Sequence, residues 1–160
     1  KPEPTTSPLF NQAVIFASLI ELETRFDDEK PLISEVIWRR LRDKVPLAID
    51  AAIIYGIPNY DGNIRWAHLA DAKNPYNTRI HVGLPPTAIG APDSKALEAV
   101  LHPSNFGYYY YVLMPGQERH HFSKTLAEHN DHVADLRRAQ TQAPAPAPPT
   151  ARSGQAAAPR

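Results

Sequence analysis

The feature that most limits the fold of this chain is a mostly apolar run, Ala13–Ile20, which Glu23 follows closely. The run is far too short to span a bilayer, so we expect it to be buried within a folded domain. Ser7 before Pro8 is typical of a helix start, because proline fits the first helical position. We therefore predict a first helix that runs to about Phe26 and lies in the core.

A carboxylate lies on the buried side of this predicted helix. In helical spacing Glu23 follows Ile20 and Leu19, so its side chain should lean toward the apolar face. Burial disfavours a charged carboxylate and raises its pKa, which suits a group that donates a proton near neutral pH. The structural alternative is an ion pair between Glu23 and an arginine such as Arg25, because such pairs also perturb carboxylates.

Local patterns predict the remaining elements. Apolar periodicity and capping residues favour helices at 31–44, 94–103 and 125–138. The run Asp50–Gly56 suits a strand or a helix, and we favour a short helix with Asp50 as its N-cap. Residues 58–75 read as an irregular excursion with at most one turn, near Trp66–Leu69. Aromatic and β-branched runs favour strands at 78–82, 108–114 and 120–122.

The expected fold class is α+β, with helices packed around a small antiparallel sheet and Glu23 on the first helix. Residues 1–8 are rich in proline and threonine, and we expect them to be disordered. Residues 139–160 contain no acidic or aromatic residue and repeat Ala-Pro pairs, so they cannot bury enough surface to order themselves. One folded domain is therefore predicted at residues 9–138.

Composition excludes several classes of protein. Basic and acidic residues number 17 each, so no net charge attracts the chain to nucleic acid. Cysteine is absent, which removes disulfides and thiol nucleophiles. Four of the seven histidines lie at 120, 121, 129 and 132, across a predicted strand-to-helix junction rather than in a compact ligand pair. We therefore predict neither a metal site nor any other cofactor.

A series of short motifs resembles one known family. In chain order these motifs are Ala17-Ser18-Leu19-Ile20-Glu21-Leu22-Glu23-Thr24, Arg40-Leu41, Leu47 with Asp50, Ile54-Tyr55-Gly56, Tyr76-Asn77-Thr78, Gly83-Leu84-Pro85-Pro86, His120-x-Phe122 and Leu126-Ala127-x-His129-Asn130. Together they resemble the endolytic murein transglycosylases (the YceG-like or MltG family) over about residues 11–138. The catalytic glutamate of that family is the one followed by threonine, which corresponds to Glu23 and not to Glu21.

The resemblance implies a lytic reaction on peptidoglycan, a role in cell wall assembly and glycan chain termination, and no cofactor. The β-1,4 bond between N-acetylmuramic acid and N-acetylglucosamine is cleaved and a 1,6-anhydromuramoyl end is left. Ordinary glycosidases need two carboxylates, one of which activates water or forms a covalent intermediate. In the lytic route the C6 hydroxyl of the sugar is the nucleophile, so Glu23 alone can serve as acid and then as base.

The resemblance also implies substrate-binding residues, which are Asp50, Tyr76, Asn77, Thr78, His120 and Phe122. Most of these residues also suit another role, which their own chemistry and position indicate without the resemblance. Asp50 suits an N-cap, or the second carboxylate of a hydrolase that pairs it with Glu23. Tyr76-Asn77-Thr78 suits a turn, with Asn77 bonding its own backbone. His120 and Phe122 alternate onto one side of a strand, but a lone histidine is more often a surface residue.

Further expectations concern partners and location. Members of the family carry an N-terminal membrane anchor and a LysM-like region, so this chain looks like a C-terminal portion without the anchor. The resemblance implies glycan strands as substrate, peptidoglycan synthases as partners, and the periplasmic face of the bacterial inner membrane. Arg39, Ala48, Ala51 and Thr87 depart from the family pattern. Ala48 in particular replaces a usual polar residue, which leaves a weakly active or inactive glycan-binding or scaffold module as an alternative.

Overall fold

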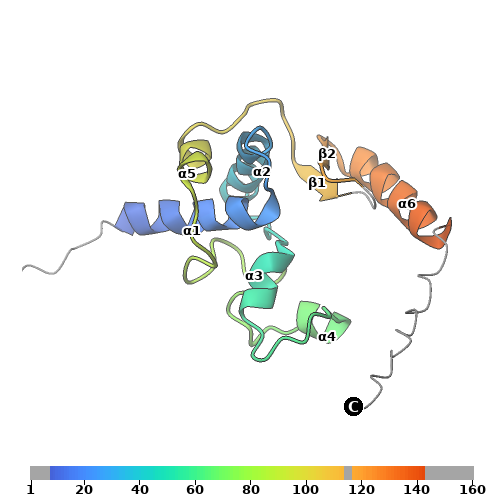
Figure 1. The fold of residues 1–160 in the computed structure, drawn as a ribbon, viewed down its shortest axis with the longest axis horizontal. Helices are drawn as coiled ribbons and strands as arrows, with labels where there is room; N and C mark the ends of the chain where they lie inside the picture. Colours follow the sequence, from blue (N-terminus) through green and yellow to red (C-terminus); the bar gives the residue numbers. More distant parts are fainter. Residues whose placement is uncertain (1–7, 114–116, 143–160) are drawn as a thin grey trace, which may run out of the picture.

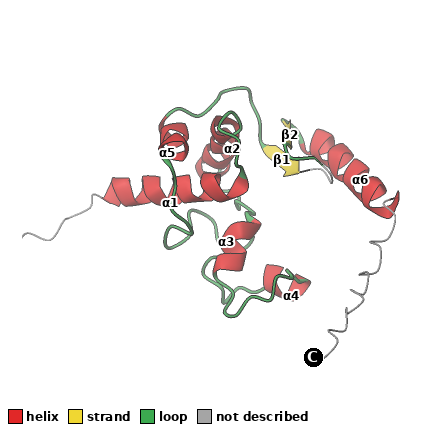
Figure 2. Ribbon diagram, in the orientation of Figure 1, coloured by secondary structure: helices red, strands yellow, loops and turns green. Residues whose placement is uncertain are grey.

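The computed structural model describes residues 8–113 and 117–142, which form six helices and a two-stranded antiparallel sheet (Figures 1 and 2). The elements in chain order are α1 (Pro8–Glu23), α2 (Lys30–Arg42), α3 (Asp50–Tyr55), α4 (Trp66–Leu69), α5 (Ser94–Leu101), β1 (Tyr110–Leu113), β2 (His120–Ser123) and α6 (Leu126–Gln142). The predicted α+β class is confirmed. Within the described ranges, no helix is both long and apolar enough to cross a membrane.

Helices α1, α2 and α5 pack together and form what we call the helical body (Figure 1). The predicted burial of the first helix is confirmed, because Phe16, Leu19 and Ile20 are at most 2% exposed. Ile33 and Ile37 of α2 meet them from the other side of the core. Burying an aliphatic side chain of this size contributes about 1.5–3 kcal/mol to folding. The helical body is therefore held by apolar packing.

Helix α1 ends at Glu23, earlier than the predicted end near Phe26. The cause is Thr24, whose Oγ1 accepts a hydrogen bond from the backbone N–H of Phe26 at 3.1 Å and turns the chain toward α2. Helix α2 has a charged face, but Glu35 on this helix is not solvated. That side chain is 3% exposed and accepts hydrogen bonds from the loop after α5.

The segment from α3 to α5 departs most from prediction. Helix α4 confirms the expected turn, but no strand forms at 78–82. Instead, the backbone N–H groups of Ile80 and His81 both donate to the carbonyl of Asn77, at 3.0 and 2.9 Å, and this makes a turn. Asp50 does not cap α3, whose N-cap is Ile49, although Gly56 ends the helix as expected.

The sheet and the last helix form a second group, here called the hairpin unit (β1, β2 and α6). Tyr111 faces Phe122 across the antiparallel pair, so the predicted hairpin is confirmed with a shorter first strand. The capping box that opens α6 is present, because Glu128 N–H donates to Thr125 Oγ1 at 3.2 Å and Thr125 N–H donates to Glu128 at 3.4 Å. The helix reaches Gln142 rather than Arg138. Disorder was predicted for 1–8 and 139–160, but Pro8 and residues 139–142 are helical, and the rest of both segments lies outside the described residues.

Candidate active site

A cavity of about 450 Å³ opens between the helical body and the hairpin unit. Its lining comes from both groups and from the segment around α3: Glu23, Arg40, Leu47, Ala48, Asp50, Arg79, Tyr111, Val112, Leu113, His120, His129 and Val133. Its volume lies in the range typical of ligand sites. Three of the predicted site residues, Glu23, Asp50 and His120, are therefore brought together from positions far apart in the sequence.

Glu23 lies partly buried at the last residue of α1, where the core meets the cavity. Burial raises the pKa of the Glu23 carboxyl group, and the nearby charge of Asp50 raises it further. A hydrogen bond with the Tyr111 side chain and the charge of His120 act in the opposite direction without cancelling the rise. Glu23 therefore keeps its proton to a higher pH than a free glutamate, as expected from its place on the apolar face.

Tyr111 is a site residue that the sequence did not single out. Burial and the adjacent Glu23 carboxylate raise the pKa of the Tyr111 hydroxyl well above its ordinary value. The phenol therefore stays protonated and acts as a hydrogen-bond donor to Glu23. The predicted strand of four tyrosines contained this residue, and only the inward alternation along the strand distinguishes it from its neighbours.

Asp50 points into the cavity instead of capping α3. Its Oδ1 accepts hydrogen bonds from Arg79 Nε at 3.0 Å and from Nη2 at 2.8 Å. Both side chains are nearly half exposed, so the pair adds little to stability. It does fix the direction of the Asp50 carboxylate and places a positive charge beside it. Arg79 was not predicted as a site residue.

His120 is not a surface histidine, because its side chain is only 7% exposed. Its Nδ1 lies 2.9 Å from Glu29 Oε2, and its backbone N–H donates to Glu29 Oε1 at 3.0 Å. The ring meets the Tyr111 ring edge to face, with centroids 5.3 Å apart. Sequence reasoning missed Glu29, since the acidic run Asp27-Asp28-Glu29 looks like a solvated break between helices.

Four predicted substrate-binding residues do not line the cavity. Asn77 is fully buried, and its amide donates to the carbonyls of Leu69 and Asp71 at 3.1 and 2.9 Å. Thr78 is 2% exposed and exchanges hydrogen bonds with the backbone of Ile49, at 2.9 and 3.0 Å. These two residues therefore fold the excursion onto α3 and are not available to a sugar.

The other two residues of this set are aromatic. The Tyr76 hydroxyl shares a hydrogen bond with Thr87 at 2.9 Å, and its ring packs against Tyr55 with centroids 5.0 Å apart. Phe122 packs against the core and lies 6.0 Å from the Tyr111 ring. Both rings therefore pack against the core and do not line the cavity.

Two further lining residues have unusual settings. Ala48 has a φ of 56°, a left-handed conformation that costs a residue with a Cβ about 1–2 kcal/mol. Strain of this kind is often found at functional sites. Arg40 donates hydrogen bonds to the carbonyls of Leu47 at 2.8 Å and Tyr109 at 3.2 Å. It therefore links the segment before α3 to the segment before β1. In the described residues, no cluster of three or more acidic, histidine or cysteine side chains has the arrangement of a metal site.

Comparison with known proteins gives a consistent result. A profile described as the YceG-like family matches residues 2–135. The chain is 32% identical over 120 residues to an endolytic murein transglycosylase of Bacillus subtilis, a match that covers 75% of this chain and 33% of the relative. It is 26% identical over 129 residues to one of Streptococcus pneumoniae, covering 78% of this chain and 23% of the relative.

A solved structure is similar as well. A yceG-like protein of Listeria monocytogenes superimposes with a TM-score of 0.71 and 29% sequence identity, covering 76% of this chain and 39% of that one. The chain therefore spans only about a third or less of the length of the curated relatives it matches.

Proposed function

Because this chain belongs to the YceG-like family, we propose that it carries the catalytic site of a peptidoglycan lytic transglycosylase. Its substrate is the β-1,4 bond between N-acetylmuramic acid and N-acetylglucosamine in glycan strands, and its product carries a 1,6-anhydromuramoyl end. The observation that supports this most is one partly buried carboxyl group, Glu23, whose raised pKa and place in the cavity suit a general acid.

In this reaction Glu23 gives its proton to the glycosidic oxygen as the bond to C1 breaks. The C6 hydroxyl of the same muramoyl residue then bonds to C1, and the Glu23 carboxylate takes the hydroxyl proton. The Tyr111 hydroxyl stabilises the carboxylate between the two transfers. General acid–base transfer of this kind contributes about 100- to 10,000-fold to the rate. Holding the C6 hydroxyl close to C1 supplies the remainder.

Asp50 takes the role of a sugar-binding residue in this proposal. A hydrolase would need a second carboxylate free to activate water or to attack C1. The guanidinium of Arg79 holds Asp50 Oδ1 through two hydrogen bonds, so this oxygen is already engaged by a cation and is not free to attack C1 or to bind a water proton. With Asp50 engaged in this way, a single-acid mechanism at Glu23 accounts for the site more simply.

The proposed substrate also implies a location and partners for the protein. Murein lies outside the cytoplasmic membrane, so the site works on the extracytoplasmic side of the cell envelope. Peptidoglycan synthases are proposed as partners, since a glycan-cutting activity that ends strands must be matched to the synthesis of those strands.

Digestion of purified glycan strands with the chain, followed by mass spectrometry of the products, tests this function. Anhydromuramoyl ends are expected, and the Glu23→Gln variant should lose at least about 100-fold in rate while keeping its fold. Glu21→Gln is the matched control, because Glu21 pairs with Lys30 and is absent from the lining of the cavity that holds Asp50 and Tyr111. Reducing ends that contain added water would instead indicate a hydrolase using Glu23 and Asp50. Strand binding without cleavage would indicate a scaffold module.

A further inference from the structure

A buried carboxylate lies outside the cavity and is not used by the mechanism above. Glu29 precedes α2 and is 3% exposed, yet its side chain does not cap that helix. A buried carboxylate is costly unless hydrogen bonds compensate it. Its oxygens receive three: from the His120 backbone at 3.0 Å, from His120 Nδ1 at 2.9 Å and from Thr24 Oγ1 at 2.8 Å.

The two contacts with His120 fix both the backbone and the ring of a residue 91 positions away. Because Nδ1 faces a carboxylate, the neutral ring carries its proton on Nδ1, and Nε2 is left as the acceptor. In residues 8–113 and 117–142, Nε2 has no hydrogen-bond partner, and the ring lines the cavity beside Glu23. Nε2 is therefore the ring atom that a bound sugar would meet.

The third contact ties the same carboxylate to the catalytic helix. Thr24 directly follows Glu23, is 6% exposed, and donates its hydroxyl to Glu29 while accepting the N–H of Phe26. Glu29 thus links the backbone that carries Glu23 to the strand that carries His120. This gives a physical reason for a threonine next to the proposed acid.

We propose that Glu29 is a positioning residue, which fixes His120 as the Nδ1–H tautomer with Nε2 directed at the sugar bound beside Glu23. The inference rests on the proposed function for its substrate. The hydrogen bonds that hold the ring are independent of that function, so the two can fail separately.

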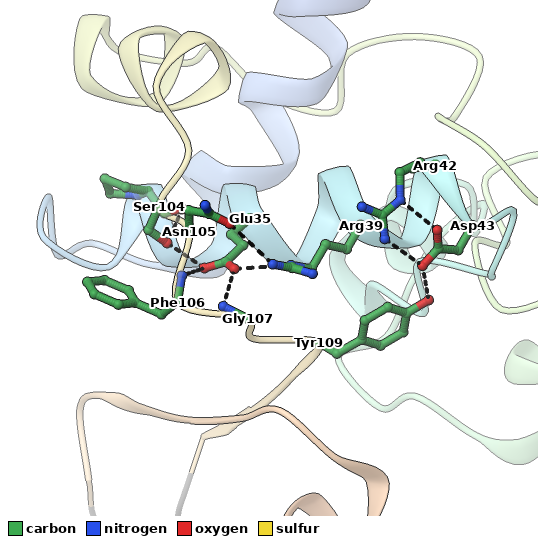
Figure 3. Close-up of polar contacts among 10 residues, drawn as sticks. Glu35, Arg39, Arg42, Asp43, Ser104, Asn105, Phe106, Gly107 and Tyr109 are labelled. Carbon is green, nitrogen blue, oxygen red and sulfur yellow. Dashed lines mark hydrogen bonds and ion pairs between the residues drawn. The ribbon is translucent and has the colours of Figure 1, made fainter.

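Glu35 offers a matched control for Glu29. It is also 3% exposed, lies on α2, and accepts hydrogen bonds from Ser104 Oγ at 2.8 Å and the Gly107 N–H at 2.6 Å (Figure 3). Its partners are Arg39 on α2 and residues of the loop before β1, and none of them lines the cavity that holds Glu23 and Asp50. Replacing either glutamate by glutamine therefore removes a buried charge from the same helix region, but only one of the two contacts His120.

The experiment measures ¹⁵N histidine spectra and steady-state cleavage for the full chain, Glu29→Gln and Glu35→Gln. Neutral His120 should appear as the Nδ1–H tautomer in the unaltered chain and in Glu35→Gln. In Glu29→Gln this signature should be lost, with kcat lower by about tenfold or more and KM changed less than about twofold. Glu35→Gln should keep both kinetic constants.

Several outcomes would overturn the inference. An Nε2–H tautomer in the unaltered chain would do so even if no variant folded. Unchanged tautomer and kcat in Glu29→Gln, or equal losses of kcat in both variants, would assign Glu29 a structural role only. If the unaltered chain cleaved nothing, the proposed function would fail, and the spectra alone would still decide whether Glu29 sets the His120 ring.

Discussion

The helical body and the hairpin unit are held in place by different kinds of interaction. The core of the body consists of fully buried apolar side chains such as Leu19, Ile33 and Ile37. Most residues of β1 and β2 are partly rather than fully buried, and the strands pack mainly against each other and α6. The hairpin unit is joined to the body by Tyr111 and Phe122, which pack against the core, and also by charged side chains from α2 and the turn before it.

Three of these polar attachments come from α2 and the residue directly before it. Glu29 binds the His120 backbone and ring, Arg40 binds the Tyr109 carbonyl, and Glu35 binds the loop at Gly107. Figure 3 shows how the loop before β1 follows α2 from Glu35 toward Tyr109, whose hydroxyl reaches Asp43 at 3.2 Å. The cavity therefore lies at a boundary where one of the contacts that attach the hairpin unit, Glu29 with His120, also orients a site residue.

The strongest expected effect comes from shortening a buried apolar side chain of the helical body. Ile37 is 1% exposed, so Ile37→Ala should lower the free energy of unfolding by about 2–5 kcal/mol, through lost apolar burial and an unfilled space. Urea unfolding followed by circular dichroism measures this loss. Amide exchange should show weaker protection in both the body and the hairpin unit, because the unit depends on α2 for its attachment.

The control for this variant is Ile80→Ala. Ile80 is 40% exposed, so this substitution removes the same atoms from the surface. A change within about 0.5 kcal/mol is expected there. A similarly small effect for Ile37→Ala would mean that apolar packing does not dominate the body.

Lowering the pH should have a smaller effect on stability. The hairpin unit should lose stability before the helical body does. Burial alone would raise the pKa of Glu29, but its hydrogen bonds with His120 and Thr24 lower it below the ordinary value. The pKa of Glu35 is lowered in the same way by Ser104 and the backbone of the loop, against the effect of burial. A lowered folded-state pKa stabilises the fold above the unfolded pKa, near 4.5, and this contribution is lost as the pH falls through the folded value.

The pKa of Glu23 is shifted in the opposite direction, because burial raises it in the folded state. Its contribution is present below the unfolded pKa and is lost as the pH rises through the folded value. Amide exchange between pH 6 and pH 3 should therefore show β1 and β2 losing protection before α1. Simultaneous loss in all three elements, or earlier loss in α1, would contradict the difference between the two groups.

Local signals in the sequence predicted much of the fold, and long-range contacts account for the rest. Periodicity and caps predicted α2 and α5 to within about two residues, and the Thr125–Glu128 box marked the start of α6. The strand predicted at 78–82 was wrong because Thr78 bonds Ile49, 29 residues earlier, and no local pattern records that contact.

The residues of the candidate site also divide into those that local sequence signals predicted and those that depend on long-range contacts. The burial of Glu23 could be predicted because it follows from helical spacing, whereas its proposed role came from the resemblance to the family. Glu29 and Arg79 could not, because their roles depend on partners 91 and 29 residues away in the sequence. Asn77 was expected to line the cavity but is buried elsewhere, since its amide donates to backbone carbonyls whose positions the sequence does not predict.

The smallest effect is expected from removing residues 143–160, which should disturb neither group. This segment contains no acidic or aromatic residue and is rich in proline and alanine, so it lacks the side chains that could offset an ordering cost of about 1–2 kcal/mol per residue. A chain ending at Gln142 keeps all of α6 and should retain its melting temperature and its rate of glycan cleavage within error. Ending the chain at Arg138 is the informative comparison, because it shortens α6, which reaches Gln142. A loss of several degrees for the cut at Gln142 would show that the removed segment stabilises the domain, and a loss only for the cut at Arg138 would show that the last turn of α6 supports the hairpin unit.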